Sequence, residues 1–183
     1  GQNRGVRAVA ITARGHVVAS GGQDGSVRLW NAVNGRAIAH LQGHTAGLWG
    51  VAISNDGATV ASGGADETVR LWETATGKTH AVLEGHSGGV YSLALAQDGS
   101  LLASGSGDGS VRLWNAVSGR LIATLRGHAS AVAGLALSPA GELMASGGGD
   151  GTICIWDLQT GQTLKTLLGH TNPVWGIAYS ADG

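Results

Sequence analysis

Hydrophobic and polar positions alternate along this chain in short blocks that repeat over its whole length. The first block contains four apolar runs, Val6 to Thr12, His16 to Ser20, Ser26 to Asn31 and Arg36 to Leu41, each bounded by Gly, Asn or Asp. Runs of this length, rich in Val, Ile, Leu and Ala and separated by turn residues, are typical of β-strands joined by tight turns. No segment carries an apolar stripe at helical spacing. The pattern therefore predicts four antiparallel strands per block and no helix.

The block recurs with a period of 42 residues and without an insertion or deletion. The residues that return in register are His44, His86, His128 and His170; Ser20, Ser62, Ser104 and Ser146; Asp24, Asp66, Asp108 and Asp150; and Trp30, Trp72, Trp114 and Trp156. A fixed period of this size indicates a modular architecture. We expect complete units at 1–42, 43–84, 85–126 and 127–168. Residues 169–183 would open a fifth unit, with Val174 to Ser180 as its first strand.

The strands are apolar on both faces, which favours sheets that are covered on both sides. In the run Ser26 to Asn31, Val27 and Leu29 share one face while Trp30 lies on the other. Strands of this kind are buried on both faces. Four-stranded units satisfy this by stacking face to face around an axis, as the blades of a propeller do. The predicted fold is therefore an all-β propeller of four-stranded antiparallel blades.

At this point the residues resemble the WD-repeat family over the whole chain. Each unit carries the family's succession of Gly-His, an apolar strand, Asp-Gly or its equivalent, Ala-Ser-Gly-Gly, an Asp turn and Val-Arg-Leu-Trp. The resemblance implies a hydrogen-bonded tetrad in each blade. Its members would be His44, Ser62, Asp66 and Trp72 in the second blade, His86, Ser104, Asp108 and Trp114 in the third, and His128, Ser146, Asp150 and Trp156 in the fourth. Gln2 stands where the first blade's His would be, so we expect an incomplete tetrad there.

Ser, His and Asp together also suggest a catalytic triad, and His a metal site. Their return in every unit beside a Trp favours a structural role, because a single active site does not need such repetition. The spacing of the His residues argues against zinc, whose ligands usually come in close pairs. Glycine-rich turns such as 105–109 lack the following helix that a phosphate loop needs. An enzyme would need paired acids or metal ligands at non-repeating channel positions, and the sequence shows none. We therefore expect a non-enzymatic protein with no catalytic residue, metal or cofactor.

Charge and composition exclude further classes of partner. Charged residues make up 13% of the chain and the formal net charge is −1, which argues against nucleic acid and anionic membranes as partners. No apolar run approaches the roughly 18 residues of a membrane-spanning helix. Cys154 is the single cysteine, which excludes a disulfide within the chain and favours a cytoplasmic location.

The positions that break the repeat are the better candidates for function. The seventh residue of successive units is Arg7, Trp49, Tyr91, Ala133 and Trp175. In the WD-repeat family this position forms the partner-binding face at the channel mouth, together with the residue two before it and the residue before the tetrad Asp. The matches for those two positions are Gly47, Gly89, Ala131 and Pro173, and Gln23, Ala65, Gly107 and Gly149. Because Trp, Tyr and Arg are enriched at binding hot spots, the candidate site, here called the rim site, is Arg7, Gln23, Trp49, Tyr91 and Trp175. Alternatively, Trp49 and Trp175 pack between adjacent blades.

These observations favour a scaffold that binds a protein or peptide, for example as the sensor region of a larger signalling protein. Four blades are too few for the family's usual ring. The chain is therefore expected to be either part of a longer propeller or a unit that closes a ring by self-association, for instance as a homodimer. A self-assembling unit without another partner is the alternative function.

Overall fold

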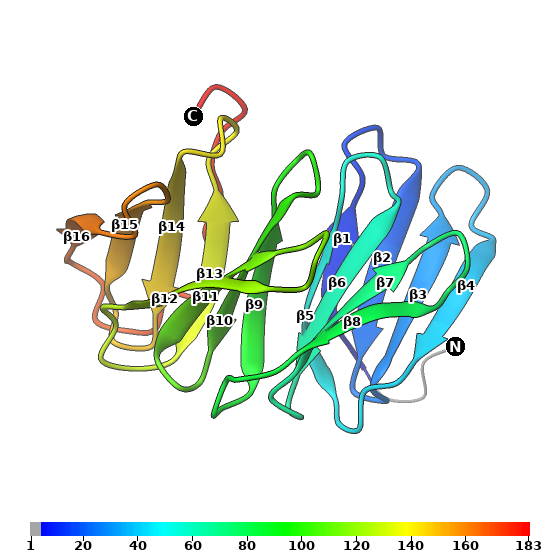
Figure 1. The fold of residues 1–183 in the computed structure, drawn as a ribbon, viewed down its shortest axis with the longest axis horizontal. Helices are drawn as coiled ribbons and strands as arrows, with labels where there is room; N and C mark the ends of the chain where they lie inside the picture. Colours follow the sequence, from blue (N-terminus) through cyan, green and yellow to red (C-terminus); the bar gives the residue numbers. More distant parts are fainter. Residues whose placement is uncertain (1–4) are drawn as a thin grey trace.

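The computed structural model describes residues 5–183, and these residues fold into four separate four-stranded sheets (Figure 1). Sheet by sheet, the strands are β1 (Val6–Ile11), β2 (Val17–Gly22), β3 (Ser26–Asn31) and β4 (Ala37–Gln42); β5 (Leu48–Ile53), β6 (Thr59–Gly64), β7 (Val69–Glu73) and β8 (Thr79–Leu83); β9 (Val90–Leu95), β10 (Leu101–Ser106), β11 (Ser110–Asn115) and β12 (Leu121–Arg126); β13 (Val132–Leu137), β14 (Leu143–Gly148), β15 (Ile153–Asp157) and β16 (Thr163–Leu167). All strands are antiparallel to their neighbours and follow one another in chain order. The described residues contain no helix, as the sequence pattern predicts.

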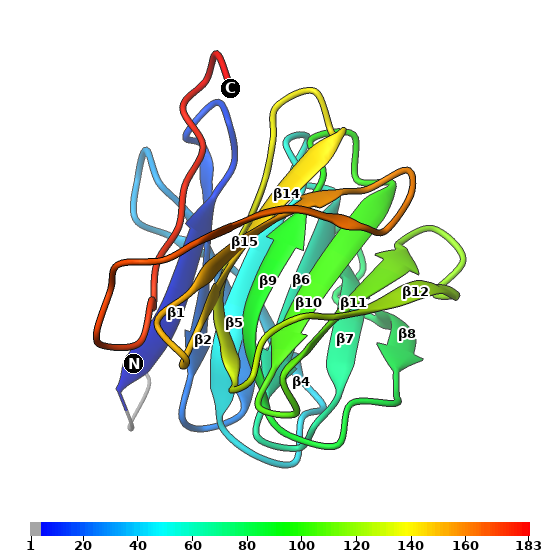
Figure 2. The ribbon, with the colours of Figure 1, turned by 90° about the vertical axis from the view of Figure 1, so that its left-hand side faces the viewer.

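The four sheets are arranged as blades of a β-propeller, which confirms the predicted fold class. The first strands of successive sheets, β1, β5, β9 and β13, lie side by side, and Figure 2 looks along this row from the end where β14 and β15 lie, with the sheets one behind another. The apolar core lies between adjacent blades: Leu29 of the first packs in one cluster with Leu48 and Val60 of the second. Glycines on the second strands permit this close approach. A Cβ at Gly105 would lie 2.7 Å from Cγ1 of Val132 on the next blade.

The face of the first blade that points away from the second is open to solvent. Val6, Val9 and Ile11 on β1 are 52%, 63% and 57% exposed. Their counterparts on β5, Leu48, Val51 and Ile53, are 0%, 8% and 9% exposed because the first blade covers them. Residues 5–183 thus form a partial propeller and do not close a ring (Figure 1).

The expectation of a strand from Val174 to Ser180 is wrong, because this segment belongs to no sheet. It nevertheless follows the fourth blade: the Val174 amide donates to the Gly148 carbonyl at 3.0 Å, and the Val174 side chain is 9% exposed. A strand needs a hydrogen-bonded neighbour. Blades contact one another through side chains rather than ladders, so the fourth blade cannot supply that neighbour.

Candidate binding site at the channel mouth

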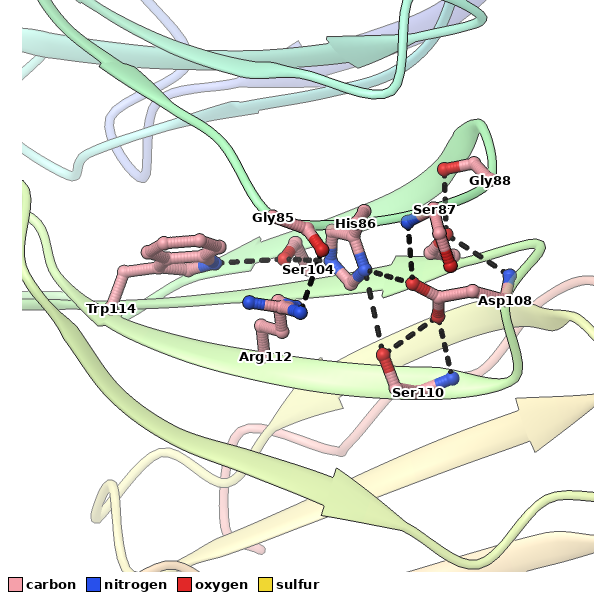
Figure 3. A network of polar contacts seen from close by, with 10 residues as sticks. Gly85, His86, Ser87, Gly88, Ser104, Asp108, Ser110, Arg112 and Trp114 are labelled. Carbon is pink, nitrogen blue, oxygen red and sulfur yellow. Dashed lines mark hydrogen bonds and ion pairs between the residues drawn. The ribbon is translucent and has the colours of Figure 1, made fainter.

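A chain of hydrogen bonds ties the third blade together at the end of the molecule where the strand β9 begins (Figure 3). The Trp114 indole donates to Oγ of Ser104 at 2.8 Å, and Ser104 Oγ lies 2.8 Å from Nε2 of His86. On the other side of the ring, Nδ1 of His86 lies 2.9 Å from Oδ2 of Asp108, which also accepts from the Ser87 amide at 3.0 Å. Because Ser104 accepts from Trp114, its own proton is directed to His86, which leaves Nδ1–H as the donor to Asp108.

The second and fourth blades contain the same arrangement. The corresponding contacts join Trp72, Ser62, His44 and Asp66 at 2.7, 2.8 and 2.8 Å, and Trp156, Ser146, His128 and Asp150 at 2.7, 2.7 and 3.2 Å. In the first blade Trp30 donates to Ser20 at 2.9 Å, but Gln2 lies outside the described residues.

Charge in the tetrads is fixed by their surroundings. Burial lowers the pKa of His86 below 6.5, despite the opposing effect of Asp108. Burial raises the pKa of Asp108, but hydrogen bonds from Ser110, His86 and Ser87 outweigh it and hold this pKa well below its usual range. At neutral pH the pair is therefore a neutral imidazole beside a carboxylate. Ser104 is 0% exposed, so its hydroxyl has no access to a substrate. This geometry supports a structural role, because a fully bonded buried network rigidifies the loops it connects.

Two residues of the rim site meet across the boundary between the second and third blades. The rings of Trp49 and Tyr91 stack with centroids 4.5 Å apart and an interplanar angle of 5°. Both are partly exposed. In each case the pairing of the first strand with the second skips the residue, and such β-bulges re-aim side chains. Glycines lie against both rings: a Cβ at Gly89 would collide with Trp49, and one at Gly107 would lie 3.1 Å from Tyr91.

The other three residues of the rim site lie on other elements. Arg7 and Gln23 are exposed on the first blade, and Trp175 is 69% exposed beyond β13. Ala133, at the equivalent position of the fourth blade, is 8% exposed. The structure therefore distributes the five residues over the first, second and third blades and the last segment, and it stacks Trp49 on Tyr91.

Glu67 is a feature of this face that sequence reasoning missed. Its φ of 66° makes it the one described residue other than glycine in the left-handed region. The equivalent residues of the other blades, Gly25, Gly109 and Gly151, have φ of 75°, 78° and 78°. The replacement of a repeated turn glycine by Glu was visible in the sequence and was the signal that could have identified it.

Neither a metal site nor a membrane span is found in the described part of the chain. Within residues 5–183 no group of three or more His, Cys, Asp or Glu side chains could hold an ion. No helix in this range is long and apolar enough to cross a membrane.

An open hollow lies at the opposite end of the inner strands from the rim site. It is lined by Ile53, Leu95, Leu137 and Tyr179 among others.

Comparison with known proteins gives one family. The family described as "WD domain, G-beta repeat" matches the chain five times, at residues 1–31, 35–73, 77–115, 119–157 and 161–183. The first four matches end with the third strand of each sheet, so their boundaries are offset from units that begin at Gly-His. No curated protein matches the chain.

Proposed function

Because this chain belongs to the WD40 repeat family, whose members generally mediate protein–protein interactions and are typically non-enzymatic, we propose that it is a scaffold that binds a protein or peptide at the rim site. The rim site comprises Arg7, Gln23, Trp49, Tyr91 and Trp175. The proposal includes the division into four blades at 1–42, 43–84, 85–126 and 127–168, with 169–183 belonging to a fifth. A cytoplasmic location and a place in the sensor region of a larger signalling protein are its finer parts.

The stacked pair of Trp49 and Tyr91 is the observation that carries this proposal. The position has no fixed role in the fold, because the first and fourth blades place Arg7 and Ala133 there. Two large, rigid rings that remain partly exposed beside small residues offer contact area at low cost in conformational entropy. The contact of Trp49 with Gly89 on the next blade supports packing between blades as well. One ring can serve both roles, since packing on one side preorganises the side that a partner meets.

Selection of a random 12-residue peptide library on the full chain tests the proposal. We expect selected peptides to bind the wild-type protein and to lose at least tenfold in affinity for the double variant Trp49→Ala/Tyr91→Ala. Val117→Ala is the matched control, because Val117 is 70% exposed on a turn between β11 and β12. Peptides that bind the double variant as tightly as the wild type would show that the partner does not use the rim site.

Self-association is a second candidate function, favoured by the exposed face of β1. Three large apolar side chains on one strand, Val6, Val9 and Ile11, are more than half exposed, and exposed apolar patches mark interaction sites. On this proposal a second copy covers the face and completes the propeller. Light scattering after size exclusion would then give a dimer that Val9→Lys converts to monomers. A monomeric wild-type chain contradicts self-association. In that case further blades of a longer protein would cover the exposed face of β1.

A further inference from the structure

Several residues at the boundary between the second and third blades differ from their equivalents in the other units. They are Trp49, Glu67, Gly88, Tyr91 and Ser106. Several of them touch: Trp49 lies on Gly89 and stacks on Tyr91, and the Ser106 hydroxyl donates to the Gly88 carbonyl at 2.7 Å. These contacts join residues that vary between units into one continuous surface at this boundary.

Glu67 belongs to this surface through the position it occupies. In the first blade a Cβ at Gly25 would lie 2.9 Å from the Ala46 carbonyl, and in the third a Cβ at Gly109 would lie 3.3 Å from the Ser130 carbonyl. The turn position thus faces the loop that follows Gly-His on the next blade. By the same repeat, Glu67 faces the loop that contains Gly88.

Nothing in the fold compensates for the backbone strain at Glu67. A left-handed conformation is unfavourable for a residue with a Cβ, and glycine would adopt it freely. Glu67 is exposed, and no hydrogen bond or ion pair within residues 5–183 involves its carboxylate. Backbone strain at an exposed residue that no packing contact offsets points to a function for that residue.

The charges near the aromatic pair favour one sign of ligand. The positions that surround the channel mouth on these two blades are Gly47, Trp49, Ala65 and Glu67, and Gly89, Tyr91, Gly107 and Gly109. Glu67 is the charged residue among them. Arg70 and Arg112, on the third strands of these blades, lie over Trp72 and Trp114, each 5.9 Å from the ring centroid. The other cations of the two blades, Lys78, Arg120 and Arg126, lie on or next to the outer strands β8 and β12. Aromatic faces beside an uncompensated carboxylate attract a cation.

We propose that the boundary between the second and third blades receives a cationic side chain of the partner, an Arg guanidinium or a Lys ammonium. The cation packs against the rings of Trp49 and Tyr91 and pairs with Glu67. The partner is therefore a protein segment that carries an exposed basic residue. This inference rests on the proposed function and specifies the chemistry of the partner.

Peptides selected from the random library on the wild-type chain provide the probe. We expect them to be enriched in Arg or Lys, and replacement of that residue by Gln to weaken binding about tenfold in calorimetric titrations. Glu67→Gln is expected to cause a similar loss. Glu84→Gln is the matched control, because Glu84 is exposed just after β8, outside this surface.

Glu67→Gly separates binding from folding. It restores the residue that the other three blades carry, so we expect a Tm about 2–4 °C higher than that of the wild type together with the same loss of affinity. Peptides that depend on Trp49 but show no enrichment in basic residues, or that bind Glu67→Gln as tightly as the wild type, would overturn the inference while leaving the proposed function intact. Peptides that ignore Trp49 and Tyr91 would overturn both.

Discussion

The guanidinium of Arg28 is ion-paired with Asp24, with Nη1 3.0 Å from Oδ2, on the blade whose tetrad His is replaced by Gln2. On the second blade the equivalent carboxylate, Asp66, pairs with His44 instead. The same turn is thus held by a cation from its own sheet in one blade and by an imidazole in the other. The Asp turn persists in both, because its main task is to bond backbone and side-chain donors two residues ahead, as Asp24 does with Ser26.

We expect the ion pair of the first blade to contribute little to stability. The side chains of Arg28 and Asp24 are 16% and 24% exposed, and partly exposed pairs are worth about 0–1 kcal/mol. Arg28→Ala is therefore expected to lower the free energy of unfolding by no more than about 1 kcal/mol. Urea titrations at low and at high NaCl measure it, since salt screens such pairs. A larger loss that salt does not diminish would mean that Arg28 acts mainly through packing.

The tetrad Trp residues are expected to contribute far more. Trp72 is 1% exposed and donates to Ser62 at 2.7 Å. Trp72→Ala leaves a cavity as well as a lost donor, and we expect a loss of about 3–5 kcal/mol in the free energy of unfolding. Trp72→Phe retains most of the ring volume and is expected to lose about 1–2 kcal/mol. Denaturant titrations followed by circular dichroism compare the two, and equal losses would contradict a separate role for the indole hydrogen bond.

How far the strands could be predicted depends on what defines each one. The run from Ser26 to Asn31 was predicted with the bounds that β3 has, because turn residues limit it on both sides. The preceding run was predicted to stop at Ser20, whereas β2 continues to Gly22. The glycines there suggested a turn. In the structure Gly21 is a point of close contact, where a Cβ would lie 2.6 Å from Val51 of the next blade. Contacts between blades are not encoded in the pattern of a single unit.

The rim site also depends on contacts between blades, which the pattern of a single unit does not encode. The repeat identified position 49 and position 91 as variable, and the resemblance to the WD-repeat family implied that Trp49 and Tyr91 face a partner. Their stacking depends on the separation of β5 and β9, which no local pattern gives. Trp175 was grouped with them by position, but it lies on the last segment, outside the four sheets.

Acid is expected to destabilise the protein in two stages. Burial holds the folded-state pKa of His44 and His86 below 6.5, so the unfolded chain binds more protons as the pH falls below 6.5 and the stability decreases. A second loss follows from Asp150, whose pKa is lowered to about 2; burial raises it, but hydrogen bonds from Thr152 and neighbouring groups prevail. That contribution is complete above about pH 4 and is lost as the pH falls toward 2.

Thermal melts at half-unit intervals between pH 8 and pH 2 measure both stages. Asp150→Asn, which removes this carboxylate, is expected to reduce the loss below pH 4 and to leave the stage below pH 6.5 unchanged. Asp66 and Asp108 still contribute to the loss below pH 4, because burial raises their pKa values but hydrogen bonds prevail and lower them. A wild-type Tm that stays constant between pH 7 and pH 5 would contradict the assignment of the first stage to the tetrad His residues.

A single methyl group at Gly148 is expected to break the tetrad of the fourth blade. A Cβ there would collide with Oδ1 of Asp150 and Nδ1 of His128, the two atoms that face each other in the tetrad. Overpacking of this kind costs about 1–3 kcal/mol, so Gly148→Ala should lower the free energy of unfolding by that amount in urea titrations. Gly176→Ala is the control, because nothing lies within 4 Å of a Cβ at that position. The third blade shows that a side chain at this site needs bonds of its own, since Ser106 there donates to a carbonyl and accepts from the amide two residues ahead. Alanine makes no such bonds, and a Gly148→Ala variant as stable as the wild type would mean that the His128 ring moves aside without loss.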